Sequence, residues 1–229
     1  MHSLIGFVLV LAPLIPSGDV QTKVRALEHR YHRAGTLKAV FFERYTDGTG
    51  GGSAESGTVY FSRPGRMRWE YESPEPKLFL VDGTNVWFYV PADRTASRAK
   101  LQESSDWRTP LALLAGKADL SKLCRMVEEA DGAADPNSKR GAGVSSAGES
   151  VLRCIPRDSS GSPAREILFE TDSQSYLVRV VIREPGNAET EFRFGNWQEN
   201  IPIPELKFHF EPPPGVVITD EAALSGAIH

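Results

Sequence analysis

The side chains that could carry catalysis form no recognisable active site in this sequence. It contains no Gly-x-Ser-x-Gly nucleophile turn and no His-Glu-x-x-His metal motif. The glycines at 50–52 lack the Lys-Ser or Lys-Thr that completes a phosphate-binding loop. His29 and His32 are three residues apart, but no third metal ligand is apparent, so two solvated histidines are the simpler interpretation. The sequence therefore predicts no catalytic residues, no metal and no cofactor.

Two cysteines, Cys124 and Cys154, are the only thiols in the chain. Both fall in strand-like stretches separated by a polar loop, so a cross-strand disulfide is compatible with an oxidising compartment. Two buried thiols fit the sequence equally well, because spacing alone does not define the distance between them.

One stretch shows a clear apolar face. Met67, Trp69 and Tyr71 alternate with charged residues and therefore share one side of a strand. If the pleat continues back through Gly65, Arg63 falls on that apolar side, and its guanidinium needs acceptors such as the backbone carbonyls of a covering segment. Alternatively, the Pro-Gly turn resets the register and leaves Arg63 exposed.

A short apolar helix is expected to follow the first group of strands. Pro110 suits its first turn and Gly116 its end. Leu111, Leu113 and Leu114 leave this helix almost without a polar face. Such a helix either packs into a core or faces an apolar ligand.

The spacing of apolar residues predicts the helices and strands that position these side chains. Val24, Leu27 and Tyr31 recur at helical spacing and predict a helix over 20–33. From residue 36 onward the period changes to two, and the following segments are expected as strands: 36–42, 57–62, 66–71, 77–81, 85–90, 120–127, 150–155, 164–170, 176–183, 190–194 and 206–210. Residues 94–117 break this rhythm, and 130–148 are expected to form a long loop.

These elements predict a mainly β protein with α-helices, of the α+β class. A sheet of about eleven strands curls strongly. Helices laid in its concave side are the economical packing.

The two ends of the chain and its net charge limit the class of protein to which it can belong. The apolar residues 4–15 are too short to span a bilayer, and 1–18 read as a signal peptide with no clear cleavage site; a buried N-terminal strand or helix is the alternative. Residues 19–220 then form one domain, and 221–229 a tail. The 229 residues carry a net charge of −4, which argues against a nucleic-acid partner.

Five segments, taken in order, resemble the LolA family of periplasmic lipoprotein carriers. They are residues 41–47, 57–71, 81–89, 109–114 and 208–216, and the resemblance covers roughly 20–220. The resemblance implies an unclosed antiparallel β-barrel with a helical lid over a hydrophobic cavity, a fold shared with the outer-membrane receptor LolB. The receptor is itself a lipoprotein, and the absence of a cysteine near the expected cleavage site favours the soluble carrier.

The resemblance also implies roles for individual residues. Arg63 corresponds to the arginine that locks the lid. We expect the apolar cavity to be formed by Leu27, Tyr31, Phe41, Met67, Trp69, Leu111, Leu113 and Leu114. Met67 and Tyr31 differ from the residues seen in some members, and these differences bear on the shape of the cavity and its ligand preference.

By this resemblance the chain is a monomeric periplasmic carrier and not an enzyme. It accepts acylated lipoproteins from an inner-membrane ABC-type release complex and passes them to an outer-membrane receptor. The main alternative is a periplasmic lipid- or lipoprotein-sensing domain of the same fold that acts in envelope signalling. A lipid or glycan hydrolase and a structural envelope protein are further alternatives.

Overall fold

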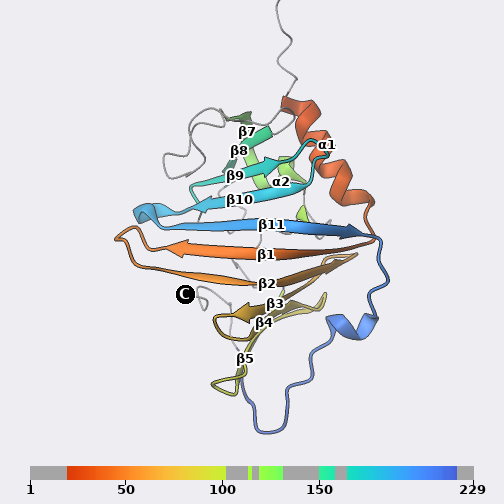
Figure 1. The fold of residues 1–229 in the computed structure, drawn as a ribbon, viewed down its shortest axis with the longest axis vertical. Helices are drawn as coiled ribbons and strands as arrows, with labels where there is room; N and C mark the ends of the chain where they lie inside the picture. Colours follow the sequence, from red (N-terminus) through yellow and green to blue (C-terminus); the bar gives the residue numbers. More distant parts are fainter. Residues whose placement is uncertain (1–19, 102–112, 115–118, 131–149, 158–163, 221–229) are drawn as a thin grey trace, which may run out of the picture.

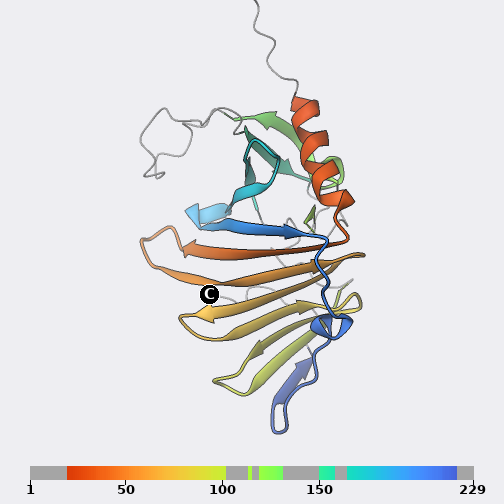
Figure 2. The same cartoon turned by 45° about the vertical axis from the view of Figure 1, so that its right-hand side comes forward.

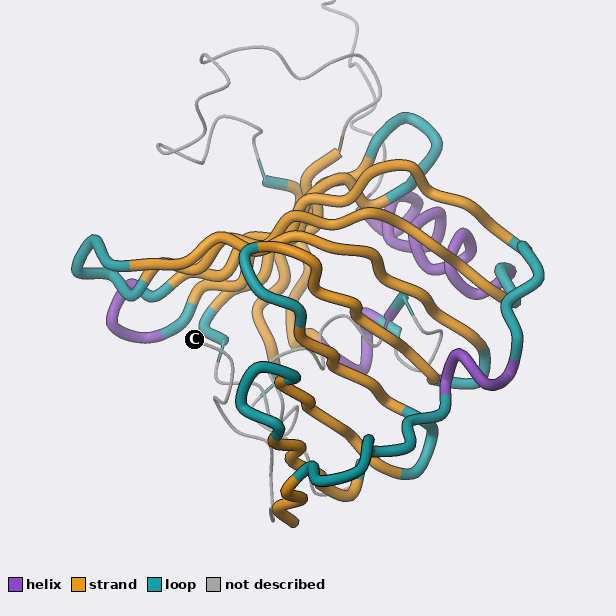
Figure 3. Tube along the Cα trace, turned by 60° about the horizontal axis from the view of Figure 1, so that its bottom comes forward, coloured by secondary structure: helices purple, strands orange, loops and turns teal. Residues whose placement is uncertain are grey.

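The computed structural model describes residues 20–101, 113–114, 119–130, 150–157 and 164–220. These residues form one twelve-stranded sheet with the strand order β12-β6-β5-β4-β3-β2-β1-β11-β10-β9-β8-β7. Every pair of neighbours is antiparallel except β12 and β6, which run parallel. The sheet curls on itself but ends at β12 and β7, so the barrel is unclosed (Figure 3). The predicted fold class is confirmed, with twelve strands in place of about eleven.

The strands are mostly five to eleven residues long. Their bounds are β1 Thr36–Thr46, β2 Gly52–Ser62, β3 Arg66–Ser73, β4 Lys77–Val81, β5 Asn85–Val90, β6 Thr95–Lys100, β7 Cys124–Glu129, β8 Ser150–Pro156, β9 Glu166–Thr171, β10 Leu177–Arg183, β11 Glu189–Glu199 and β12 Val217–Asp220. A short 3-10 helix, η3 (Pro185–Asn187), connects β10 to β11.

Two α-helices pack on one side of this sheet. Helix α1 (Val20–Arg33) has the predicted bounds and buries the predicted face, which includes Leu27 and Tyr31. It lies at the β7–β10 end of the sheet (Figure 2). Helix α2 (Leu120–Leu123) is a single turn that leads directly into β7. The side that both helices cover is called the inner face below.

The outer face of the β1–β11 half carries ion pairs beside apolar side chains such as Val40 and Phe42 of β1, which are each 42% exposed. Glu191 of β11 is 1% exposed and pairs with Arg44 of β1 at 2.7 Å, Arg193 at 2.9 Å and Arg179 of β10 at 2.5 Å. Burial alone would raise the pKa of Glu191, but the hydrogen bond from Arg179 and the charges of Arg179 and Arg193 hold that pKa below its usual range. Charged side chains of β1, β10 and β11 therefore pair with one another on the outer face, whereas the inward residues of these strands are mostly apolar.

The segment after β11 covers the outer face of the other half. It descends past β3 to β5 in Figure 1 and places Phe208 against Leu80 and Trp87. The predicted strand over 206–210 was wrong, because Glu205–Phe208 is a 3-10 helix, η4, followed by irregular chain. Prolines at 204 and 212 flank the segment and remove backbone donors that a sheet needs. Its apolar residues cover the sheet from outside, and the last strand is instead β12.

Two other predictions were wrong. Residues 95–100, expected to break the strand rhythm, form β6. Residues 120–123, expected as strand, form α2, because Leu120 and Leu123 are both buried at helical spacing. The expected signal peptide over 1–18, Pro110, Gly116, residues 131–148 of the expected loop and the tail over 221–229 lie outside the described residues.

Candidate functional site

The centre of the inner face is aromatic. Trp69 of β3 is fully buried, and its ring lies edge-on to several phenylalanines. The centroid distances are 4.9 Å to Phe41, 5.5 Å to Phe192, 6.1 Å to Phe61 and 6.1 Å to Phe194. Strands β1, β2, β3 and β11 are consecutive neighbours in the sheet, so their inward residues meet at this point. This cluster forms an apolar floor.

The predicted cavity residues belong to one buried cluster. Leu27, Tyr31, Phe41, Met67, Trp69, Leu113 and Leu114 are all members of it. Met67 is the most exposed of these, at 6%, while Leu113 and Leu114 are 1% and 2% exposed. Leu111 lies outside the described residues. The structure therefore shows the described members of the set packed together, with two leucines of the expected lid buried among the floor residues.

Helix α1 is held to the sheet by Tyr31. Its hydroxyl accepts a 2.7 Å hydrogen bond from the backbone N–H of Leu177, and its ring lies edge-on to Trp197 at 5.6 Å. Burial raises the pKa of Tyr31 above its usual range, so the hydroxyl stays neutral. The indole N–H of Trp197 donates to the carbonyl of Leu177 at 2.8 Å. Sequence reasoning missed Trp197, because the register of β11 against β1 shifts between Gly195 and Gln198 and simple alternation from Phe194 therefore does not place Trp197 on the inner face.

Arg63 lies at the same end of the inner face. The guanidinium Nη2 of Arg63 donates to the backbone carbonyl of Tyr31, in the last turn of α1. The backbone N–H of Arg63 donates to the backbone carbonyl of Gly35 at 3.1 Å. Burial lowers the pKa of the Arg63 guanidinium. Its Nε is buried without a hydrogen-bond partner among the described residues. The structure thus gives Arg63 a carbonyl partner in α1, whereas the sequence placed that carbonyl in the segment around Leu111.

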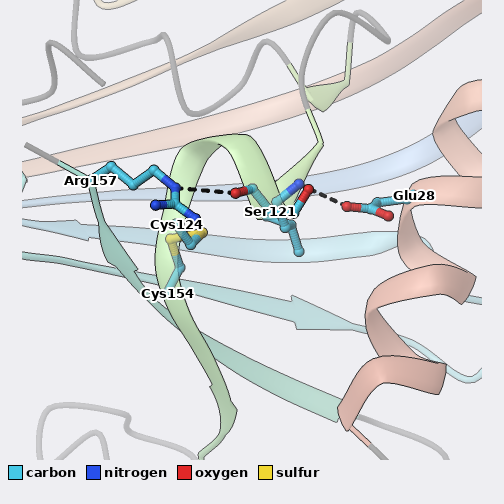
Figure 4. Close-up of a disulfide and its surroundings, with 6 residues drawn as sticks. Glu28, Ser121, Cys124, Cys154 and Arg157 are labelled. Atoms are coloured by element: carbon cyan, nitrogen blue, oxygen red, sulfur yellow. Dashed lines mark hydrogen bonds between the residues drawn. A yellow bond between two sulfur atoms is a disulfide. The ribbon is translucent and has the colours of Figure 1, made fainter. Parts of the chain in front are cut away.

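One disulfide and two hydrogen bonds hold helix α2 in place (Figure 4). Cys124 and Cys154, whose pairing the sequence left open, form a disulfide between the start of β7 and β8. Glu28 of α1 accepts a 2.7 Å hydrogen bond from the backbone N–H of Leu120, and Arg157 donates to Ser121 O at 3.2 Å. Helices α1 and α2 are therefore joined to each other and to the sheet edge.

One end of the inner face is polar. The hydroxyl of Tyr71 donates to Glu43 Oε2 at 2.8 Å, and these residues are 2% and 4% exposed. Lys77 pairs with Glu55, which lies opposite Glu43 in the sheet register. Sequence reasoning missed Glu43, although the alternation that places Phe41 inward places Glu43 inward too.

The described ranges contain no group of three or more His, Cys, Asp or Glu side chains able to hold a metal ion. The Nε2 atom of His32 lies 3.2 Å from Oδ1 of Asp119. No helix in these ranges is both long and apolar enough to cross a bilayer.

The fold and the site define a half-barrel protein whose apolar interior is covered by helices. The family model of the outer membrane lipoprotein carrier protein LolA matches residues 32–137. An outer-membrane lipoprotein carrier protein of Dechloromonas aromatica is 30% identical over 192 residues, which are 81% of this chain and 82% of the relative. One from Nitrosomonas europaea is 29% identical over 219 residues, covering 93% and 98% of the two chains. The chain belongs to the LolA family.

A solved structure shows the same fold. The crystal structure of an uncharacterized conserved protein from Thermus thermophilus matches with a TM-score of 0.52 and 9% identity, covering 89% of this chain and 98% of the other. At that identity the similarity concerns the fold alone.

Proposed function

We propose that this protein is a periplasmic carrier that shelters the acyl chains of lipoproteins on its inner face and catalyses no reaction. The observation that supports this most directly is the apolar floor around Trp69, with Leu113 and Leu114 buried in the same cluster. The carrier takes its cargo from an inner-membrane ABC-type release complex and delivers it to an outer-membrane receptor.

The energetics favour reversible binding. Each buried methylene contributes about 0.8 kcal/mol, so one acyl chain contributes on the order of 10 kcal/mol. A carrier that kept all of this free energy would release its cargo too slowly. Leu113 and Leu114 are buried in the same cluster as the floor residues, and we take this packing to be the closed state. Cargo therefore replaces existing leucine contacts, and the difference between the two states is smaller than the gross burial.

Binding of a fluorescent lipopeptide tests this proposal. The full chain is titrated with a triacylated peptide and with the same peptide lacking its acyl chains, and anisotropy is followed. We expect a dissociation constant on the order of 1 μM or tighter for the lipopeptide, equivalent to about −8 kcal/mol. The unacylated peptide is expected not to bind. Equal binding of both peptides, or of neither, would overturn the carrier function.

Arg63 is expected to control release. In the closed state its guanidinium bonds the end of α1, so Arg63→Leu weakens that state relative to the open, loaded one. We predict that the variant still binds lipopeptide but releases it to acceptor liposomes about tenfold more slowly, as expected for loss of one hydrogen bond from a charged group. Arg63→Lys keeps a cation able to reach the carbonyl and serves as the control. Transfer by Arg63→Leu at the wild-type rate would contradict this role.

A further inference from the structure

A polar pocket lies beside the C-terminal half of helix α1, and none of the residues of the aromatic floor lines it. The pocket is bounded by α1, by the turn that joins β9 to β10, and by the end of β11, which lies beside the last turn of α1 in Figure 1. Its volume of about 480 Å³ falls within the range of about 300 to 1,000 Å³ that is usual for small-molecule sites. A ligand in this pocket is therefore separate from acyl chains on the inner face.

Arg30 of α1 holds one wall of the pocket in place. Its guanidinium donates to the backbone carbonyl of Gln174 from Nη2 at 2.7 Å and from Nε at 3.0 Å, and it lies 4.2 Å from the centroid of the Tyr176 ring. The Nη1 atom of Arg30 pairs with Glu199 at 3.2 Å. Glu199 is the only acid among the described residues that line the pocket, so its charge is already engaged by a cation of the same wall.

Three further side chains bring hydrogen-bond donors to the pocket and have no partner for them. Arg33 and His29 of α1 both line it, and neither has a hydrogen bond or an ion pair in the part of the chain that the structure describes. The amide of Asn200 has a defined orientation, because its Oδ1 accepts a 2.8 Å hydrogen bond from the backbone N–H of Gly35. The two N–H donors on Nδ2 of Asn200 are therefore left for another group.

The charge and the donors of the pocket together define the ligand. The lining carries two positive charges, from Arg30 and Arg33, and one negative charge, from Glu199, although the whole chain has a net charge of −4. A guanidinium binds a phosphate through two parallel N–H bonds. A carboxylate also fits the guanidinium, but the imidazole and the amide add donors that match the larger number of acceptor oxygens on a phosphate.

We propose that this pocket binds a phosphate group, carried by a phospholipid head group or present as the free ion. Arg33 is the main ligand of the phosphate, and His29 and Asn200 Nδ2 donate to its other oxygens. The volume leaves room for the glycerol that a lipid phosphate carries. The site goes beyond the proposed carrier function and does not depend on it, because its residues lie outside the aromatic floor.

Two small anions test the site in the wild-type chain. Inorganic phosphate and acetate are titrated separately at fixed pH and ionic strength, and the imidazole signals of His29 are followed by NMR. We expect a saturable change with phosphate, with a dissociation constant on the order of 1 mM, and at least about fivefold weaker binding of acetate. Acetate binding as tight as phosphate binding, or no saturation with either anion, would overturn the proposal.

Vesicles then identify the source of the phosphate. The wild-type chain is sedimented with vesicles of phosphatidylglycerol, and vesicles of phosphatidylcholine control for binding through exposed apolar side chains. Co-sedimentation with phosphatidylglycerol that inorganic phosphate competes away assigns the pocket to a lipid head group. Without such competition, the binding seen by NMR assigns it to the free ion.

A matched pair of variants assigns the binding to the pocket. Arg33→Gln is expected to weaken phosphate binding about tenfold, because it removes the charge that pairs with the phosphate. Arg25→Gln removes the same charge from another exposed position of α1 that does not line the pocket, and it is expected to change the affinity less than about twofold. Equal losses in the two variants would mean that the charge of the helix attracts the anion diffusely, and the pocket would be wrong.

Lipopeptide binding by the same variants separates this site from the carrier function. Neither Arg25 nor Arg33 belongs to the buried apolar cluster, so both variants are expected to bind the lipopeptide as the wild type does. A wild-type chain that binds phosphate but no lipopeptide would overturn the carrier function and leave the phosphate site standing. The reverse result would overturn the phosphate site alone.

Discussion

Trp69→Ala is expected to lower the free energy of unfolding by about 3 to 5 kcal/mol and to abolish lipopeptide binding. The reason is that Trp69 is fully buried and is ringed by phenylalanines from neighbouring strands, which cannot collapse into the space that the indole leaves. Urea unfolding followed by circular dichroism measures the stability, and anisotropy measures the binding at a temperature where the variant remains folded.

Trp69→Phe separates lost volume from lost chemistry. No described residue accepts a hydrogen bond from the buried indole N–H of Trp69, so phenylalanine removes an unsatisfied donor together with some volume. We expect this variant to lose only about 1 to 2 kcal/mol and to keep binding. A Trp69→Phe protein as unstable as Trp69→Ala would show that the indole N–H has a partner that matters.

Removing the disulfide is expected to destabilise the fold almost as much. The double variant Cys124→Ala/Cys154→Ala opens a loop closed by residues 30 apart in sequence, which is expected to lower the free energy of unfolding by about 3 to 4 kcal/mol. Both cysteines are buried in the folded protein, and the expected loss of stability comes mainly from the greater conformational freedom of the unfolded chain without the cross-link. Urea unfolding measures the change, and hydrogen exchange is expected to quicken first in α2 and β7.

The matched control is the wild-type chain unfolded in urea with a thiol reductant. Its midpoint should move to that of the double variant, because both chains then lack the same cross-link. A reduced wild-type protein that unfolds at the oxidised midpoint would mean that the disulfide does not stabilise the fold. Unchanged exchange in α2 would argue that Glu28 and Arg157 alone hold that helix.

Much of the architecture could be predicted because it depends on local periodicity. The apolar stripe of α1 and the alternation through β1, β3 and β5 are visible in the sequence, and the structure has these elements where they were expected. The errors fall where a short apolar segment fits several packings. Leu206 is 79% exposed and Phe208 is 4% exposed, although alternation would place both on one face of a strand. Flanking prolines and an uncovered outer face decided their conformation.

The residues of the candidate site also fall into those that the sequence pattern predicts and those that it does not. Alternation identified Met67 and Trp69 as inward residues, and it contained the signal for Glu43, which was overlooked because an acid is expected to face solvent. No local pattern indicates that Arg63 bonds a carbonyl in α1 or that Glu28 bonds α2. These contacts join residues far apart in the chain, so they depend on how the elements pack.

Side-chain periodicity was enough to establish a curled, mainly β molecule with an apolar inner face, because it dictates which side of each strand is buried. Three features came from the packing of the whole chain: the bond between Cys124 and Cys154, the hydrogen bond from Arg63 to the Tyr31 carbonyl, and the contact of Glu43 with Tyr71. The physical reason is that burial follows from the place of a single residue in a pattern. A contact is instead a distance between two elements, and that distance is set only when the sheet and its helices pack together.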